Sequence, residues 1–278
     1  MYEKFWGLKE KPFKNTPDPR FLYFFPQHQN ALKKLSIVIR ENLGAALLTG
    51  VFGCGKTLLA RALLESLSAP KYRCAYLAFP PSSGEEFLRA LVRTLRPAEL
   101  PSLRSELMED ALLESLQSVL TDNDREGKET VVISDEAHAI AREDIFERMR
   151  LLLNFQKNDK FLITLILVGQ PELATKVADL RQLDQRIAVK CHLSALSEEE
   201  TRQYILHRLK FAGAQKEIFL PEVFPAIYQA SGGIPRRINY ICELCLLTAS
   251  DLKQDRIDET VFRESRQTYA ATPGGTGE

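Results

Sequence analysis

Between residues 45 and 193, short apolar runs alternate with longer stretches whose apolar positions recur at helical spacing. Strands buried on both faces of a parallel sheet read as continuous apolar runs of this kind. The alternation predicts an α/β fold, a doubly wound parallel five-stranded sheet with helices on both faces. The predicted strands are residues 45–49, 73–79, 130–134, 162–168 and 189–193, and the predicted helices are residues 56–68, 85–95, 106–120, 143–156 and 172–180.

After residue 196 the pattern becomes purely helical, with predicted helices at residues 198–211, 221–230, 235–250 and 259–269. Ser197 and Glu200 form a capping box at the start of the first of them, and Asp258 caps the last. We therefore expect four parts along the chain. They are an N-terminal extension (1–30), an α/β core (31–195), an all-helical lid domain (196–269) and a disordered tail (270–278).

The composition narrows the class of protein but not its partner. Apolar residues make up 45% of the chain, and 37 basic residues balance 37 acidic ones. The net charge of zero gives no general reason to expect a polyanionic partner. The opening MYEKFWGLKEKPF lacks the apolar stretch of a secretory signal, and the run at 162–168 is too short to span a bilayer. We expect a cytoplasmic protein without direct membrane insertion.

The cysteines do not indicate a disulfide framework, because there are five of them and they are scattered. Cys242 and Cys245 form a CELC pair inside a predicted helix, where both thiols face one side. A single CxxC without a second pair is weak evidence for zinc, so we expect both side chains to pack in a core.

The strongest chemical signal is GVFGCGKT at residues 50–57, which fits GxxxxGK[ST] and stands between a predicted strand and a predicted helix. Such a loop points backbone N–H groups at phosphates, at the positive end of a helix. We expect Lys56 to neutralise phosphate oxygens and Thr57 to bind Mg²⁺. The predicted nucleotide-binding residues are Gly50, Val51, Phe52, Gly53, Cys54, Gly55, Lys56, Thr57 and Leu58.

Two adjacent acids, Asp135 and Glu136, follow the predicted strand at 130–134. At the carboxyl edge of the sheet, Asp135 can hold Mg²⁺ and Glu136 can act as the general base on water. A solvated turn is the competing interpretation. His138 completes a DEAH sequence, but a single histidine here is more often a loop residue than a catalyst, and no helicase motifs follow.

Three further polar residues are candidates for the same site. Gln170 follows the predicted strand at 162–168 and can orient water or sense a phosphate; alternatively, it only starts a helix before Pro171. A phosphoryl-transfer transition state favours a nearby guanidinium, from the same chain or a neighbour. The candidates for this guanidinium are Arg186 and Arg236, and Arg181 is an alternative to Arg186. Each of them can also be an ordinary surface arginine.

Taken together, these stretches resemble the AAA+ branch of the P-loop (ASCE) ATPases, and within it the ExeA/GspA-type family, which includes soluble relatives in pilus and exopolysaccharide systems. The resemblance covers residues 2–265. It rests on FWGLKEKPFKNTPDPRFLYF…QHQNAL, GVFGCGKT, DEAH, RLLLNF, ILVGQPEL, LDQRI and GGIPRRIN.

The resemblance implies roles for individual residues. It makes Gln170 the sensor-1 residue, Arg186 the arginine finger acting in trans, and Arg236 the sensor-2 residue acting in cis. It also implies a ring or helical homo-oligomer that binds ATP and Mg²⁺, with active sites between subunits. Pro12, Phe13 and Tyr23 are loose candidates for an adenine pocket.

The implied function is an ATP hydrolase that drives assembly or remodelling of a secretion, pilus or exopolysaccharide-export machinery. Longer members carry a membrane segment and a peptidoglycan-binding domain, so we expect this chain to reach the inner membrane through protein partners. A DNA-binding regulator like the TniB/MuB transposition ATPases is the alternative. Arg89, Arg93 and Arg96 are its candidate basic face, although a solvated helix face explains them equally well.

Overall fold

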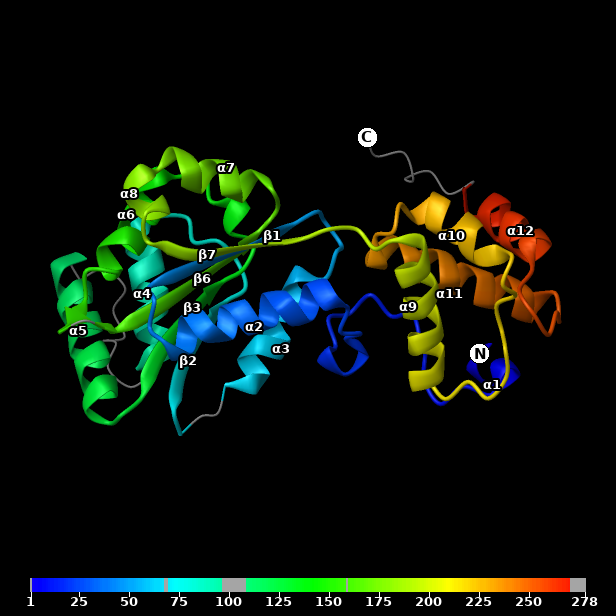
Figure 1. Ribbon diagram of the computed structural model, residues 1–278, viewed down its shortest axis with the longest axis horizontal. Helices are drawn as coiled ribbons and strands as arrows, with labels where there is room; N and C mark the ends of the chain where they lie inside the picture. Colours follow the sequence, from blue (N-terminus) through cyan, green and yellow to red (C-terminus); the bar gives the residue numbers. More distant parts are fainter. Residues whose placement is uncertain (1, 68–69, 97–108, 159, 271–278) are drawn as a thin grey trace. The chain divides into compact units, whose positions relative to one another are not determined.

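The structure is a computed structural model that describes residues 2–67, 70–96, 109–158 and 160–270 (Figure 1). The chain divides into two compact units. The α/β unit contains Pro26–Phe52 and Lys56–Leu193, and the helical unit contains Met1–Phe25, Gly53–Gly55 and Ser194–Glu278. Residues 271–278 of the tail predicted at 270–278, and residues 106–108 of the helix predicted at 106–120, lie outside the described residues.

The α/β unit contains a five-stranded parallel sheet in the order β2-β3-β6-β1-β7, which confirms the predicted fold class. No strand begins or ends more than two residues away from its predicted position. β1 and β6 are buried along their full length, as their continuous apolar sequences require. The strands are β1 (Ala45–Gly50), β2 (Tyr72–Leu77), β3 (Glu129–Ser134), β6 (Ile163–Gly169) and β7 (Ile187–Leu193).

Helices cover both faces of this sheet (Figure 1). One face carries α2 and α3, and the other packs α4, α5 and α6 into the larger hydrophobic core. The helices are α2 (Pro26–Arg40), α3 (Lys56–Ser66), α4 (Gly84–Leu95), α5 (Glu109–Arg125), α6 (Glu143–Leu152), α7 (Glu172–Asp179) and α8 (Arg181–Asp184), with a 3-10 turn η2 (Ala137–Ala139).

Two features of the α/β unit are not among the predicted elements. Helix α2 covers the start of the α/β core, where no helix was predicted. It buries Ala31, Leu35, Val38 and Ile39 at helical spacing. The predicted helix at 143–156 ends at Leu152, and a small antiparallel hairpin follows, formed by β4 (Gln156–Lys157) and β5 (Lys160–Phe161).

The helical unit has the four predicted C-terminal helices and a capping box at Ser197 and Glu200. They are α9 (Glu198–Phe211), α10 (Val223–Ser231), α11 (Pro235–Asp251) and α12 (Glu259–Ala270); a short helix α1 (Tyr2–Trp6) and a 3-10 turn η1 (Pro19–Phe21) precede them in the chain. Cys242 and Cys245 are fully buried on α11, which confirms the core-packing interpretation. Burial raises the pKa of Cys245 to about 11, so its thiol stays protonated near neutral pH.

The N-terminal segment belongs to the core of this helical unit. Tyr2, Trp6 and Phe13 are each at most 3% exposed and lie in one cluster with residues of α9, α10, α11 and α12. The indole N–H of Trp6 donates to the carbonyl of Leu246 at 3.1 Å. These aromatic side chains therefore supply apolar surface that the four C-terminal helices cover.

Arg208 on α9 fixes the path of this segment. Although only 4% exposed, its guanidinium donates to the carbonyls of Pro12 (2.5 Å) and Lys14 (3.1 Å) and to the Tyr204 hydroxyl (2.8 Å). The guanidinium also lies 4.6 Å from the centre of the Phe21 ring. Buried carbonyls need a donor, so a single side chain from α9 satisfies two carbonyls far away in sequence.

We expect Arg208→Met to destabilise the helical unit by about 3 kcal/mol, because the buried carbonyl of Pro12 and the partly buried carbonyl of Lys14 both lose a charged donor. Trp6 is the one tryptophan of the chain and is buried in this unit, so urea unfolding followed by its fluorescence reports on the unit directly. The control is Arg202→Met on the same helix, where Arg202 is exposed and pairs with Glu199; we expect a change within about 0.5 kcal/mol. Equal unfolding midpoints for the two variants would contradict this role of Arg208.

Candidate functional site

The phosphate loop connects β1 to α3, as the sequence predicts. Lys56 is the first residue of α3 and only 6% exposed, and its ammonium donates to the carbonyls of Gly50 (2.8 Å) and Val51 (3.0 Å). Gly53 has a φ of 85°, in the left-handed region that favours glycine. The result is a tight loop with a buried positive charge at the N-terminus of a helix, an arrangement suited to phosphate groups.

Asp135 lies directly after β3 and is only 2% exposed. One of its carboxylate oxygens accepts a hydrogen bond from the Tyr76 hydroxyl at 2.7 Å, and the other accepts from the backbone N–H of Glu136 at 2.8 Å. Burial, reinforced by the hydrogen bond to Asp135, raises the pKa of Tyr76 well above its usual value. Tyr76 therefore remains a neutral donor that holds Asp135 in one orientation.

Glu136 has an unusual backbone and an accessible carboxylate. Its φ of 53° and ψ of 28° place a non-glycine residue in the left-handed region, a conformation that costs energy and is enriched at functional sites. Its side chain is 40% exposed, and one carboxylate oxygen lies 3.3 Å from Nδ1 of His138. A carboxylate in this position can accept a proton from water.

Gln170 follows β6, and its amide lies 2.8 Å from Nε2 of His138. The strand order explains why it meets residues that follow β3. Because β6 lies between β1 and β3, Gly169 pairs with Thr49 on one side, and Leu167 pairs with Ser134 on the other. The residues that follow β1, β3 and β6 therefore emerge at one edge of the sheet, on adjacent strands about 4.8 Å apart.

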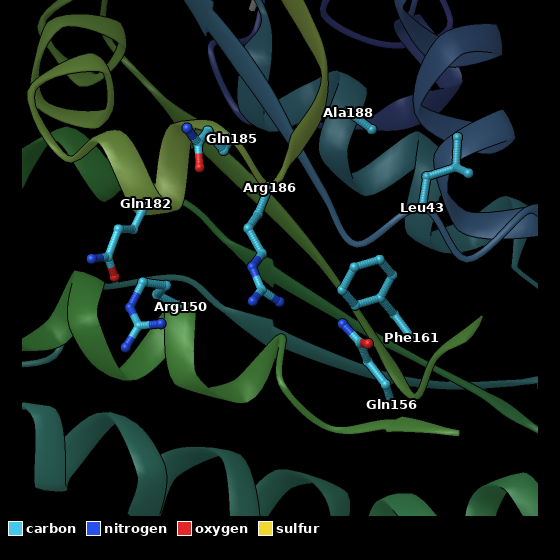
Figure 2. A pocket seen from close by; sticks show the side chains of 8 residues that line it. All are labelled: Leu43, Arg150, Gln156, Phe161, Gln182, Gln185, Arg186 and Ala188. Carbon is cyan, nitrogen blue, oxygen red and sulfur yellow. The ribbon is translucent and has the colours of Figure 1, made fainter. Parts of the chain in front are cut away.

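Arg186 occupies the opposite edge of the α/β unit, just before β7 (Figure 2). Seven strand residues separate the two edges, which is roughly 20 Å at strand spacing. Its side chain enters a cavity of about 560 Å³, whose lining also includes Arg150, Gln182 and Phe161. The guanidinium donates to the carbonyl of Leu153 and to the side chain of Asn154, both at 2.8 Å. Its competitor Arg181 is exposed at the start of α8.

The remaining candidates lie in the helical unit. Within that unit, the backbone N–H of Arg236 donates to the carbonyl of Gly53 at 3.2 Å. Phe13 is 2% exposed and packs edge-on against Phe219, while Tyr23 packs against Phe25 and His207. Phe13 is thus a core side chain of this unit, and Tyr23 packs partly buried against the same core. The carbonyl oxygen of Pro12 accepts a hydrogen bond from the guanidinium of Arg208.

The donor set at the carboxyl edge fits Mg²⁺. Thr57 offers a hydroxyl and Asp135 a carboxylate, and oxygen ligands of this kind, completed by water and phosphate oxygens, are the ones Mg²⁺ takes. Among the described residues, no cluster of three or more His, Cys, Asp and Glu side chains could hold a metal by itself.

The candidate basic face on α4 is largely neutralised by carboxylates of the same chain. Arg89 pairs with Glu85, and Arg96 pairs with Asp122. These pairs favour the solvated-helix interpretation over a surface that binds a nucleic-acid backbone.

Sequence reasoning does not find two residues of this site. Tyr76 reaches Asp135 from the neighbouring strand, and His138 reaches both Glu136 and Gln170. The signal for Tyr76 is a polar aromatic near the end of a strand that pairs with β3. His138 stands in the DEAH sequence, but its contact with Gln170 joins residues 32 positions apart and depends on the strand order.

Comparison with known proteins is consistent with this geometry. A family model described as an AAA domain matches residues 39–177, half of the 278-residue chain. General secretion pathway protein A of Aeromonas hydrophila is 36% identical over 258 residues, which are 90% of this chain and 45% of that protein. The chain thus spans less than half of that relative's length.

Solved structures show the same fold at low sequence identity. Cdc6p of Pyrobaculum aerophilum has a TM-score of 0.69 at 20% identity, over 90% of this chain and 70% of that chain. The ORC2 protein of Aeropyrum pernix, in its ADPNP–ADP complexes, has a TM-score of 0.67 at 18% identity, over 93% of this chain and 71% of that chain. At these identities the likeness concerns the fold alone.

Proposed function

Because this chain belongs to the AAA family and is a P-loop ATPase, we propose that it hydrolyses Mg–ATP at the carboxyl edge of its sheet to assemble or remodel a secretion machinery. The observation that carries the proposal is the meeting of three sequence signals at that edge. The phosphate loop, the acids Asp135 and Glu136, and Gln170 follow β1, β3 and β6, which are adjacent strands.

In this proposal the loop from Gly50 to Leu58 binds the nucleotide. Its backbone N–H groups and the N-terminus of α3 face the phosphates, and the ammonium of Lys56 exchanges its two carbonyl partners for phosphate oxygens. Thr57 and Asp135 hold Mg²⁺, which neutralises charge on the phosphates when bound. Tyr76 keeps the Asp135 carboxylate oriented.

Hydrolysis needs a base near the terminal phosphate and a group that orients the water. Glu136 accepts a proton from the attacking water, since its carboxylate is accessible and follows the residue that binds Mg²⁺. Gln170 lies between the phosphate loop and the acids in strand order, so its amide can contact both the water and the γ-phosphate. Arg236, whose backbone N–H donates to the carbonyl of Gly53 in the phosphate loop, serves as a second sensor.

Arg186 cannot reach the phosphate loop of its own α/β unit, because it lies at the opposite edge of the sheet. Its side chain is held by Leu153 and Asn154 at the mouth of an open cavity, where a second copy of the chain can present its nucleotide (Figure 2). We therefore assign Arg186 as a trans-acting arginine, which makes the working form a ring or helical homo-oligomer.

The similarity to General secretion pathway protein A supports the proposed cellular role. A secretion, pilus or exopolysaccharide-export machinery is the class of partner that this similarity favours. Among the described residues, no helix has the length and hydrophobicity needed to cross a bilayer. In the proposal the protein works on the cytoplasmic side and is recruited to the inner membrane by protein partners.

The first test separates binding from hydrolysis. We expect Glu136→Gln to lower the rate of phosphate release at least about 100-fold while keeping ATP affinity, because only the base is lost. Lys56→Ala is expected to lose ATP affinity as well. Glu143→Gln, an exposed acid at the start of α6, is the matched control and should behave like the wild type. Undiminished turnover by Glu136→Gln would contradict the assigned base.

The second test asks whether active sites are shared between copies. Arg186→Ala and Lys56→Ala are each expected to be inactive, but mixing them pairs an intact phosphate loop with an intact arginine. A random equimolar mixture should regain about a quarter of the wild-type phosphate release, since one interface in four is then complete. Arg181→Ala is the control and should retain activity alone. A mixture no more active than its components would exclude a trans role for Arg186.

A further inference from the structure

Three polar side chains at the carboxyl edge form a continuous chain of contacts. The amide of Gln170 lies 2.8 Å from Nε2 of His138, and Nδ1 of the same ring lies 3.3 Å from the carboxylate of Glu136. The three residues come from different places: the end of β6, the η2 turn, and the end of β3. Through these two contacts, the ring of His138 connects Gln170 with Glu136.

The chemistry of the two contacts determines which ring nitrogen carries a proton. An amide nitrogen is a donor only, so the Nε2 that faces it must accept, and the proton of a neutral imidazole then lies on Nδ1. If the amide is instead reversed, its oxygen requires a proton on Nε2. A neutral ring would then turn the lone pair of Nδ1 toward the carboxylate of Glu136, which is repulsive unless Nδ1 is protonated too. Both favourable arrangements place an N–H of His138 toward Glu136.

The backbone of His138 is fixed on several sides. Its carbonyl accepts from the ammonium of Lys176 at 2.6 Å, which also bonds the carbonyl of Ile140. Its backbone packs so closely on β6 that a Cβ at Gly169 would lie 2.9 Å from the His138 nitrogen. The Cα atom from which the ring extends is therefore held in place, and the side chain of His138 is only 17% exposed. A fixed donor can hold a mobile carboxylate in place.

Glu136 needs such a partner. Its left-handed backbone fixes where the side chain starts, but the carboxylate is 40% exposed and must be held toward the attacking water. Bases that act in catalysis are commonly oriented by a third group in this way. The 3.3 Å between Nδ1 of His138 and the Glu136 carboxylate is longer than a good hydrogen bond. Nδ1 has no hydrogen-bond partner of good geometry among the described residues. A small rotation of the carboxylate would therefore complete a bond between the two groups.

We propose that His138 is a positioning residue that couples Gln170 to Glu136. Gln170 fixes the imidazole through Nε2, and the imidazole orients the Glu136 carboxylate through Nδ1–H. The proton of the attacking water goes to Glu136, and His138 keeps its own proton throughout. This inference rests on the proposed function, in which Glu136 is the base and Gln170 contacts the γ-phosphate.

The kinetic test compares two variants of His138 with a control at another histidine. His138→Ala is expected to lower kcat at least about tenfold, with the affinity for a fluorescent ATP analogue changed less than twofold, because the base is misplaced while the phosphate loop is intact. His138→Asn keeps an N–H near Nδ1 and should recover part of kcat. His192→Gln, at an exposed position on β7, should match the wild type. Wild-type kcat in His138→Ala would overturn the proposal.

Coupling is measured by combining His138→Ala with Gln170→Ala. If Gln170 acts partly through His138, the loss of kcat in the double variant is smaller than the product of the single losses by at least about threefold. A double loss equal to that product means that the two side chains act independently, which overturns the coupling.

The decisive readout does not depend on turnover. The chain has four histidines, so imidazole ¹⁵N spectra of selectively labelled protein are simple, and His138→Asn identifies the signals of His138. We expect a proton on Nδ1, in the neutral or the doubly protonated ring. A neutral ring with its proton on Nε2 overturns the proposal. This result is obtained on the wild-type protein, so it holds even if His138→Ala fails to bind nucleotide.

These results also separate this inference from the function on which it rests. An active Glu136→Gln variant would remove the base from the proposed function, whatever the protonation of His138. An inactive Glu136→Gln together with a fully active His138→Ala would leave the ATPase mechanism intact and reject only the positioning role.

Discussion

The position of β6 between β1 and β3 is the constraint on which the candidate site depends. Parallel pairing on both sides of β6 carries the residues that follow these three strands to one edge. Without that order, Gln170 could not contact His138, and the end of β6 would not lie between the acids after β3 and the phosphate loop after β1. The sheet itself is held by side chains buried on both faces, so the precision of the site derives from the hydrophobic core.

The same parallel arrangement separates Arg186 from the other charged residues proposed for the site. Lys56 and the acids lie at the carboxyl edge, whereas Arg186 lies before β7 at the amino edge, held by Leu153 and Asn154. A phosphoryl-transfer site benefits from both, because a guanidinium stabilises the negative charge of the transition state. In a single α/β unit the sheet keeps them apart, and this is the physical basis for proposing that two copies share each site.

The sequence predicts those parts of the molecule that depend on local pattern. The strands, the phosphate loop and the capping box at Ser197 each need only a short stretch of chain, and the structure contains all of them. The contacts of His138 and of Arg208 could not be predicted, because they join residues far apart in the sequence. The N-terminal extension illustrates the difference: the sequence separates it from the α/β core, but only the structure shows that Phe13 lies in the core of the helical unit.

We propose above all that the loop around Lys56 and the carboxylate of Asp135 form one Mg–nucleotide site. Calorimetric titration of the protein with a slowly hydrolysed ATP analogue, with and without Mg²⁺, tests it directly for the wild type and for Asp135→Asn. The claim predicts one nucleotide per chain and an affinity that Mg²⁺ increases in the wild type but much less in Asp135→Asn. An affinity indifferent to Mg²⁺, or an equal gain from Mg²⁺ in both proteins, would contradict it.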